Sequence, residues 1–132
     1  MEDSIYTKII KGEVPCHKIY EDSDTLAFLD IYPVQPGHTL VIPKKQIEFV
    51  WDLPDDLYQA VMLTSKKVAL RIREVMPQTY VHQRVVGTDV PHAHIHLIPF
   101  NETSELRREP NMSGEPDNEA LAAVAEKLKF PA

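Results

Sequence analysis

The stretch His92-Ala93-His94-Ile95-His96-Leu97-Ile98 decides the fold and the chemistry expected of this chain. Histidine alternates with apolar residues along the stretch, and a period of two predicts a β-strand. One face of that strand would carry Ala93, Ile95 and Leu97 toward the core, and the other would carry three imidazoles. A lone histidine on a strand is usually structural. Three in register, each titrating near neutral pH, favour a functional site.

Upstream of the histidine run, the sequence predicts a short helix followed by a hairpin-like pair of strands. Eleven prolines against four glycines make rigid corners the main punctuation of the chain. In chain order we expect first a helix over 5–11, capped by Ser4 and followed directly by Gly12. A strand-like stretch from Tyr20, a strand over 26–29 ending at Asp30, a type II turn at Pro36-Gly37 and a strand over 39–42 come next.

The longest predicted helix follows this hairpin. Its apolar face recurs at spacings of three and four residues, through Leu57, Val61, Thr64, Val68, Ile72 and Val75. Asp52 is the expected N-cap, Pro54 lies in the first turn, and Met76-Pro77 ends the helix. Strands over 80–86 and 92–99, a loop around Gly87, a polar segment over 101–116 and a final helix capped by Asp117 complete the chain. This order predicts an α+β fold: a largely antiparallel sheet with a long central helix and short terminal helices.

Composition restricts the class of protein. The 132 residues suit one domain, in which 1–100 would hold the core and the histidine motif and 101–132 the polar loop and C-terminal helix. A net charge of −6 disfavours broad binding to nucleic acid or to an anionic membrane. A single cysteine, Cys16, excludes an internal disulfide and a cysteine-rich zinc module. No targeting segment or membrane span is evident, so we expect a soluble cytoplasmic protein.

Two chemistries compete for the histidine face. The first is a metal-binding module, because neutral imidazole is a common ligand for zinc or iron. In a straight strand, however, His92 and His96 would lie about 13 Å apart, so one ion could not reach all three rings. The second chemistry uses one imidazole as a nucleophile toward phosphorus and its neighbours as donors to an anionic group. The geometry of a straight row favours the second.

The histidine run resembles the signature of the histidine triad superfamily of nucleotide hydrolases and transferases. Two further segments are similar to that family in the same order. Residues 5–15 resemble its amino-terminal helix and turn, and the segments 26–33 and 36–44 resemble its central hairpin. The likeness is greatest to the histidine triad nucleotide-binding proteins and their bacterial relatives, and it implies a homodimer that needs no cofactor.

The resemblance implies a role for each histidine. His94 would be the nucleophile that forms a nucleotidyl-histidine, and His96 would donate to the phosphate oxygens. His92 would orient the nucleophile through its backbone carbonyl, which fixes the tautomer of the neighbouring ring. His38 matches an upstream histidine of the family's active site and would support the other three.

The resemblance also implies a nucleotide pocket. Asp30 matches an acid that binds the ribose, and a carboxylate can accept hydrogen bonds from both ribose hydroxyls. An apolar slot for a purine base would be lined by Tyr6, Ile9, Val14, Phe28 and Ile31, and the loop that approaches the phosphate would comprise Gly87, Thr88, Asp89 and Val90. Because such a slot holds a base mainly by burial and stacking, both AMP and GMP derivatives are expected ligands.

The sequence departs from the family at two places. Ser4, Thr7 and Gln46 stand where many bacterial relatives carry zinc ligands, so we expect no structural metal. In the loop, Thr88 occupies the position of a family glutamine, with Asp89 next to it, and Val81 or His82 stands near the position of a family asparagine. An inward carboxylate would repel phosphate, and we therefore expect Asp89 to point away from the site.

The expected activity is metal-independent hydrolysis or transfer at the α-phosphate of purine nucleoside phosphoramidates or related nucleotides. Two alternatives stay open beside the metal-binding module. One is cleavage of dinucleoside polyphosphates, in which Arg107 and Arg108 would assist. The other is a nucleotide-binding regulator with little turnover, which the altered loop at Thr88 and Asp89 favours.

Overall fold

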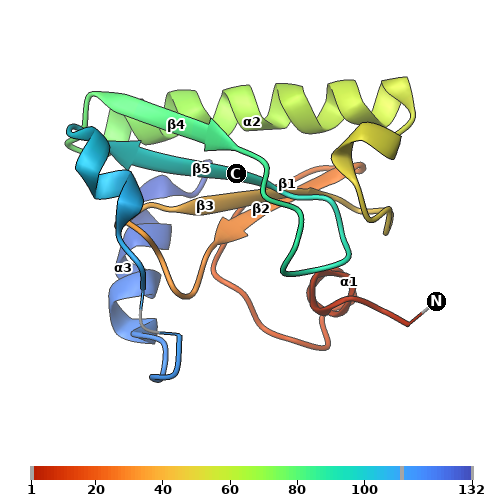
Figure 1. Cartoon of the computed structure of the whole chain (residues 1–132), viewed down its shortest axis with the longest axis horizontal. Helices are drawn as coiled ribbons and strands as arrows, with labels where there is room; N and C mark the ends of the chain where they lie inside the picture. Colours follow the sequence, from red (N-terminus) through yellow and green to blue (C-terminus); the bar gives the residue numbers. More distant parts are fainter. Residues whose placement is uncertain (1, 111, 132) are drawn as a thin grey trace.

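The computed structural model describes residues 2–110 and 112–131. Their helices and strands follow the chain in the order α1 (Ile5–Ile10), β1 (Lys18–Glu21), β2 (Thr25–Leu29), β3 (Thr39–Pro43), α2 (Asp55–Val75), β4 (Tyr80–Arg84), β5 (Ile95–Phe100) and α3 (Asn118–Leu128), with short 3-10 helices at Val50–Asp52 and Thr103–Arg107. This is the predicted α+β class, and Figure 1 shows α2 running along one side of the sheet. Among the described residues, no helix is long and apolar enough to cross a membrane.

The five strands form one antiparallel sheet in the order β1-β2-β3-β5-β4. The hairpin of β2 and β3 pairs Leu26 with Ile42 and Phe28 with Leu40. It turns at Pro36-Gly37, where Gly37 has a φ of +94°, as the predicted type II turn requires. β5 then lies between β3 and β4, so the C-terminal half of the histidine run is on an interior strand of the sheet.

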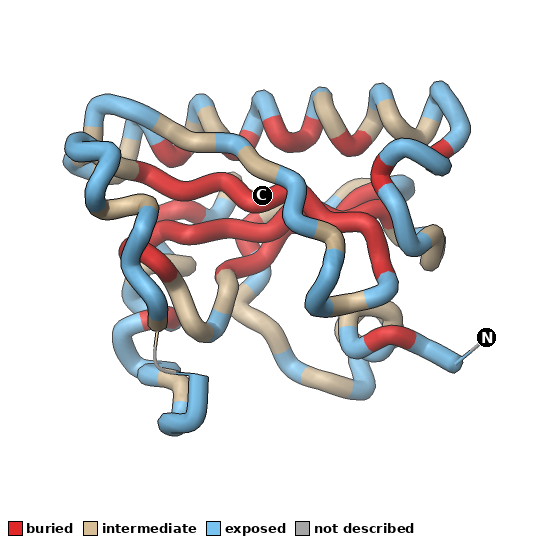
Figure 2. The backbone as a smooth tube through the Cα atoms, viewed as in Figure 1, coloured by how far each residue is buried: buried red, intermediate tan, exposed pale blue. Residues whose placement is uncertain are grey.

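The two faces of the sheet pack against different helices. α2 and α3 cover one face, where Ala27, Val41, Ile95 and Leu97 belong to the larger apolar core. α1 packs on the other face, against a smaller group formed by Leu26, Phe28, Leu40 and Ile42. Figure 2 shows burial concentrated in the central strands and on the side of α2 that meets them. The site histidines lie on the face of α1, where the sheet is only partly covered.

Helix α2 begins later than predicted. Asp52 is not its N-cap, because Val50–Asp52 form a separate 3-10 turn and the helix starts at Asp55 with Pro54 as the capping residue. Asp55 and Asp56 then occupy the first turn, where negative side chains stabilise a helix N-terminus. The predicted apolar face is otherwise correct, with Val61, Thr64, Val68 and Ile72 buried.

The histidine run is only partly a strand. β5 begins at Ile95, so His92 and His94 precede the sheet, and only His96 pairs with β3, opposite Leu40. The amide of Ala93 donates to the carbonyl of Ile47 instead of to β3. The prediction of three imidazoles on one face of a continuous strand is therefore wrong. The predicted strand over 80–86 likewise ends early, at Arg84.

Candidate active site

A cavity of about 330 Å³ opens on the face of the sheet that α1 partly covers. Most of the residues predicted for the nucleotide pocket line it, namely Tyr6, Ile9, Val14, Phe28, Asp30, Ile31, Asp89 and Val90, together with His94 and His96. Gly87 and Thr88 are not among its lining residues, and Ile5, Cys16, Tyr32, Leu40 and Met112 are lining residues that the sequence did not indicate. The cavity is therefore mainly apolar, and its ionisable groups include the two histidines and two carboxylates.

His94 is held by its own chain. Its Nδ1 lies 2.7 Å from the carbonyl oxygen of His92, and because a carbonyl only accepts, Nδ1 carries the proton. In the neutral ring, Nε2 is then left with a free lone pair. Tyr6 packs edge-on against the ring at 5.3 Å between centroids and limits its rotation. A buried imidazole in this tautomer has the form that a histidine nucleophile needs.

His96 is held in the opposite tautomer by His38. The amide of Val34 donates to Nδ1 of His38 at 3.1 Å, so in the neutral ring Nε2 of His38 carries the proton and donates to Nδ1 of His96 at 3.0 Å. His96 therefore has its proton on Nε2, a buried atom without a hydrogen-bond partner in the structure. Burial lowers the pKa of His38 to about 3 and that of His96 to about 4, so both rings are neutral at pH 7.

Asp30, His38 and His96 have the spacing of a metal site, since one ligand atom from each lies within 4.8 Å of the others. The hydrogen bond from Val34 argues against this use. With Nδ1 of His38 already accepting from an amide, a metal on Nε2 would require a fully deprotonated imidazolate. A ligating histidine normally donates through its second nitrogen, and here that nitrogen is an acceptor. His38 and His96 instead form a chain of hydrogen bonds that starts at the amide of Val34, and Oδ2 of Asp30 lies 3.7 Å from Nε2 of His38, outside that chain.

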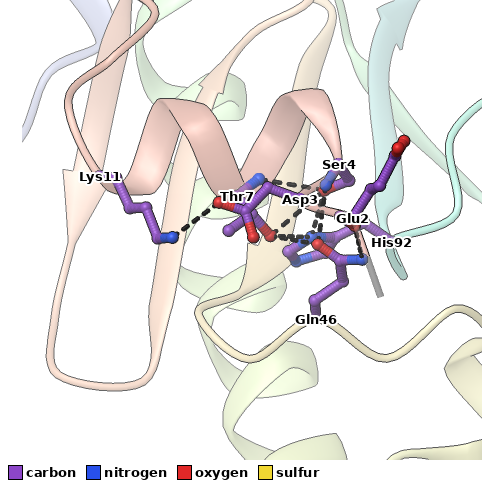
Figure 3. Close-up of polar contacts among 7 residues, drawn as sticks. All are labelled: Glu2, Asp3, Ser4, Thr7, Lys11, Gln46 and His92. Carbon is purple, nitrogen blue, oxygen red and sulfur yellow. Dashed lines mark hydrogen bonds and ion pairs between the residues drawn. The ribbon is translucent and has the colours of Figure 1, made fainter.

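Ser4, Thr7 and Gln46 meet at the imidazole of His92, as Figure 3 shows. Nε2 of His92 donates to the carbonyl of Pro43 at 2.8 Å, so Nδ1 accepts, and the hydroxyl of Ser4 lies 2.8 Å away. Thr7 donates to Oε1 of Gln46 at 2.6 Å, and the same oxygen accepts from the amide of Ser4. Each of these donors and acceptors is thus matched.

This cluster occupies the place of the zinc site that the family resemblance implies, and its chemistry does not suit the metal. Hydroxyl and amide oxygens replace the thiolate and imidazole ligands that zinc prefers in structural sites, and His92 is the single zinc-type donor of the four. The same residues instead form a closed network that joins the start of α1 to the histidine run.

Asp30 lies at the end of β2 beside the histidines. The amide of Tyr32 donates to its Oδ1 at 2.9 Å, which leaves Oδ2 for a ligand. Burial raises the pKa of Asp30, with a smaller contribution from the negative charge of Asp89. Burial also raises the pKa of Tyr6, and both carboxylates add to that shift.

Asp89 does not point away from the site. It is exposed at the rim yet lines the cavity, close enough for its charge to affect Tyr6 and Asp30. The expectation of an outward carboxylate is therefore wrong, because the loop that joins β4 to the histidine run carries Asp89 across the opening. His82, which stands near the position of the family asparagine, packs edge-on against Phe100 instead of lining the cavity.

Comparison with known proteins gives consistent matches. A sequence model of the HIT domain matches residues 11–103. The chain is 41% identical to Protein hit of Bacillus subtilis over 103 residues, which span 74% of this chain and 71% of that protein. It is 37% identical over 99 residues to the adenosine 5′-monophosphoramidase hnt1 of Schizosaccharomyces pombe, with 72% of each chain covered. A crystal structure of a HIT-like protein from Bartonella henselae superposes with a TM-score of 0.85 at 31% identity, covering 96% of this chain and 94% of that one.

Proposed function

The chain belongs to the HIT family, and we propose that it is a metal-independent hydrolase or nucleotidyl transferase acting at the α-phosphate of purine nucleoside phosphoramidates. The observation that carries the proposal is the pair of opposite tautomers at His94 and His96. One ring offers a lone pair at Nε2 and the other an N–H at Nε2, and both line one cavity. A nucleophile next to a hydrogen-bond donor is what displacement at a phosphoryl centre requires.

The reaction would proceed in two displacements. Nε2 of His94 attacks the α-phosphorus, and a P–Nε2 bond forms while the P–N bond to the leaving amine breaks. The amine nitrogen keeps the electron pair of that bond and takes a proton from solvent. A water oxygen then attacks phosphorus, the P–Nε2 bond breaks with its electrons returning to His94, and the water releases a proton. The net reaction converts phosphoramidate and water into nucleoside monophosphate and amine.

Each supporting group would act on a different part of the substrate. Nε2–H of His96 donates to a phosphoryl oxygen as negative charge builds up there. His38 positions His96 and does not touch the substrate. The free Oδ2 of Asp30 accepts from the ribose hydroxyls, and Phe28 and Ile31 pack against the base. That three yeast relatives are named adenosine 5′-monophosphoramidases supports an amine leaving group and an adenine nucleotide.

A second candidate is a nucleotide-binding regulator with little turnover, which the position of Asp89 favours. A carboxylate at the cavity rim repels an approaching phosphate and would slow each encounter. We further infer from the family resemblance that the protein acts in the cytoplasm as a homodimer. β4 lies at one edge of the sheet, and an edge strand can pair with a second chain.

Turnover of adenosine 5′-phosphoramidate, followed by quenching and intact mass measurement, tests the proposal. The wild type should release AMP and show a covalent adenylyl adduct, whereas His94→Ala should show neither and should still bind AMP within about tenfold of the wild-type affinity. Adduct formation with very slow AMP release would support the regulator. Near wild-type turnover by His94→Ala would refute the mechanism.

A further inference from the structure

Two residues that are paired across neighbouring strands at the edge of the site each carry a buried donor without a partner. Among the residues that the structure describes, three buried side-chain polar atoms make no hydrogen bond: Oε1 of Gln78, Nε of Arg84 and Nε2 of His96. The last two are both donors. Arg84 in β4 and His96 in β5 are directly opposed in the antiparallel register, so their side chains leave the sheet on the same face.

Arg84 also makes no ion pair within the described part of the chain, although the protein has a net charge of −6. Its positive charge nevertheless reaches the site. It adds to the effect of burial in lowering the pKa values of His38 and His96, and it opposes the rise that burial causes in the pKa of Asp30. The cavity itself is lined by two carboxylates and by no lysine or arginine. Arg84 is thus a cation placed at the border of an otherwise negative site.

We propose that Arg84 binds a phosphoryl oxygen of the substrate together with His96. This inference rests on the proposed function and adds a residue that neither the family resemblance nor the sequence indicated. A buried donor that has lost water and has no partner is costly, and an anionic oxygen between Arg84 and His96 would satisfy both donors at once. Guanidinium suits this role because its planar fork matches phosphate oxygens.

The order of the strands indicates how the substrate would reach Arg84. The nucleoside end of the cavity lies over β2, at Phe28 and Asp30, and the sheet continues through β3 and β5 to β4. A nucleotide that crosses the sheet in this direction places its α-phosphate at His94 and His96 and whatever follows it toward Arg84. The bound oxygen can therefore belong to the α-phosphate or to a phosphate in the leaving group.

Binding of three ligands to Arg84→Gln and Arg84→Lys, measured by calorimetry, tests this inference. The ligands are adenosine, AMP and the non-hydrolysable α,β-methylene analogue of ADP. Arg84→Gln should bind AMP or the ADP analogue about 10- to 100-fold more weakly than the wild type, with adenosine affinity changed less than twofold. Arg84→Lys, which keeps the charge and loses the fork, should show an intermediate loss. Arg73→Gln, at an exposed position of α2, is the matched control and should bind all three like the wild type.

Each outcome is decisive. A loss for AMP assigns the α-phosphate to Arg84, and a loss for the ADP analogue alone assigns a phosphate of the leaving group. Equal losses for adenosine and its phosphates would show that Arg84 acts through the fold and would overturn the inference, as would unchanged affinity for both phosphates. A wild-type protein that binds no nucleotide and turns none over would instead defeat the proposed function, before any variant is compared.

Discussion

Nε2 of His38 lies 3.0 Å from Nδ1 of His96, and this contact fixes the position of the proton on two buried rings. Because the amide of Val34 donates to the other nitrogen of His38, its proton can only be on the side of His96 while the ring is neutral. Protonation of either ring would put a second N–H against an existing donor. The hydrogen bonds that join Val34, His38 and His96 are therefore kept only while both imidazoles stay neutral in the folded protein.

The free energy of unfolding should consequently fall as the pH drops below about 6.5. Burial lowers the pKa of His38 to about 3 and of His96 to about 4, so between these values and 6.5 the unfolded chain binds protons that the folded chain does not. Stability is lost by about 1.4 kcal/mol per pH unit for each such histidine. Urea unfolding at a series of pH values between 4.5 and 7.5 measures this dependence. The free energy of unfolding of His38→Gln should change less steeply with pH than that of the wild type.

The raised pKa of Asp30 acts in the opposite direction, since the folded chain then holds a proton that the unfolded chain releases as the pH rises. That contribution is shared by the wild type and by a control at the half-buried His17, whose ring bonds to Asn118. His17→Gln should keep the wild-type slope. An unchanged slope for His38→Gln would mean that His38 takes up a proton in the folded protein.

Ser4→Ala should destabilise the protein more than the loss of a helix cap alone. Ser4 caps α1 by accepting from the amide of Thr7, and its hydroxyl also donates to Nδ1 of His92. The substitution would leave that buried nitrogen with only the Thr7 hydroxyl, which lies 3.3 Å away and already donates its proton to Gln46. A cap is worth about 1 kcal/mol and an unsatisfied buried group about 1–3 kcal/mol, so we expect a loss of roughly 2–4 kcal/mol.

Asp117→Ala is the matched control, because Asp117 caps α3 by accepting from the amide of Ala120. Its loss should be about 1 kcal/mol. The difference between the two variants in denaturant unfolding measures the bond between Ser4 and His92. Equal losses would mean that this bond adds nothing to stability.

The parts of the fold that local sequence determines were predictable. Ser4 and Asp117 are the predicted caps, and Pro36-Gly37 is the predicted turn, because capping and positive φ depend on the residues at the position itself. The histidine run was not predictable in the same way. An extended segment has a period of two whether or not it belongs to a sheet, and here the imidazole of His92 satisfies the carbonyl of Pro43 in place of a backbone amide.

The site shows the same division. His94 and His96 are marked by the motif, but the tautomers depend on Val34 and on the carbonyl of His92, which are backbone groups with no sequence signature. Arg84 carries no signal either, because its relation to His96 comes from the register of β4 against β5. Asp89 was misplaced because the direction of a loop side chain follows from the path of the whole loop.

Activity and melting temperature should be indifferent to chelators. The polar cluster of Ser4, Thr7, Gln46 and His92 satisfies its own donors and acceptors. The tautomer of His38 opposes a metal ion between Asp30, His38 and His96. Turnover and thermal unfolding measured with and without EDTA, with elemental analysis of the purified protein, check this. A stoichiometric metal whose removal lowers activity would contradict it.

Asp89→Asn should tighten the binding of AMP by about two- to fivefold at low ionic strength. Its carboxylate lies at the rim of the cavity, where it repels a phosphate. An interaction between two solvent-exposed charges contributes at most about 1 kcal/mol to the free energy of binding. The effect should shrink in 0.5 M salt, because the Debye length then falls well below the 8 Å of physiological conditions. Adenosine carries no charge, and its affinity should not change.

Glu74→Gln, which removes an exposed charge on α2, controls for net charge and should leave AMP affinity unaltered. Weaker AMP binding by Asp89→Asn would mean instead that Asp89 holds part of the nucleotide, and calorimetry at two salt concentrations separates the two results.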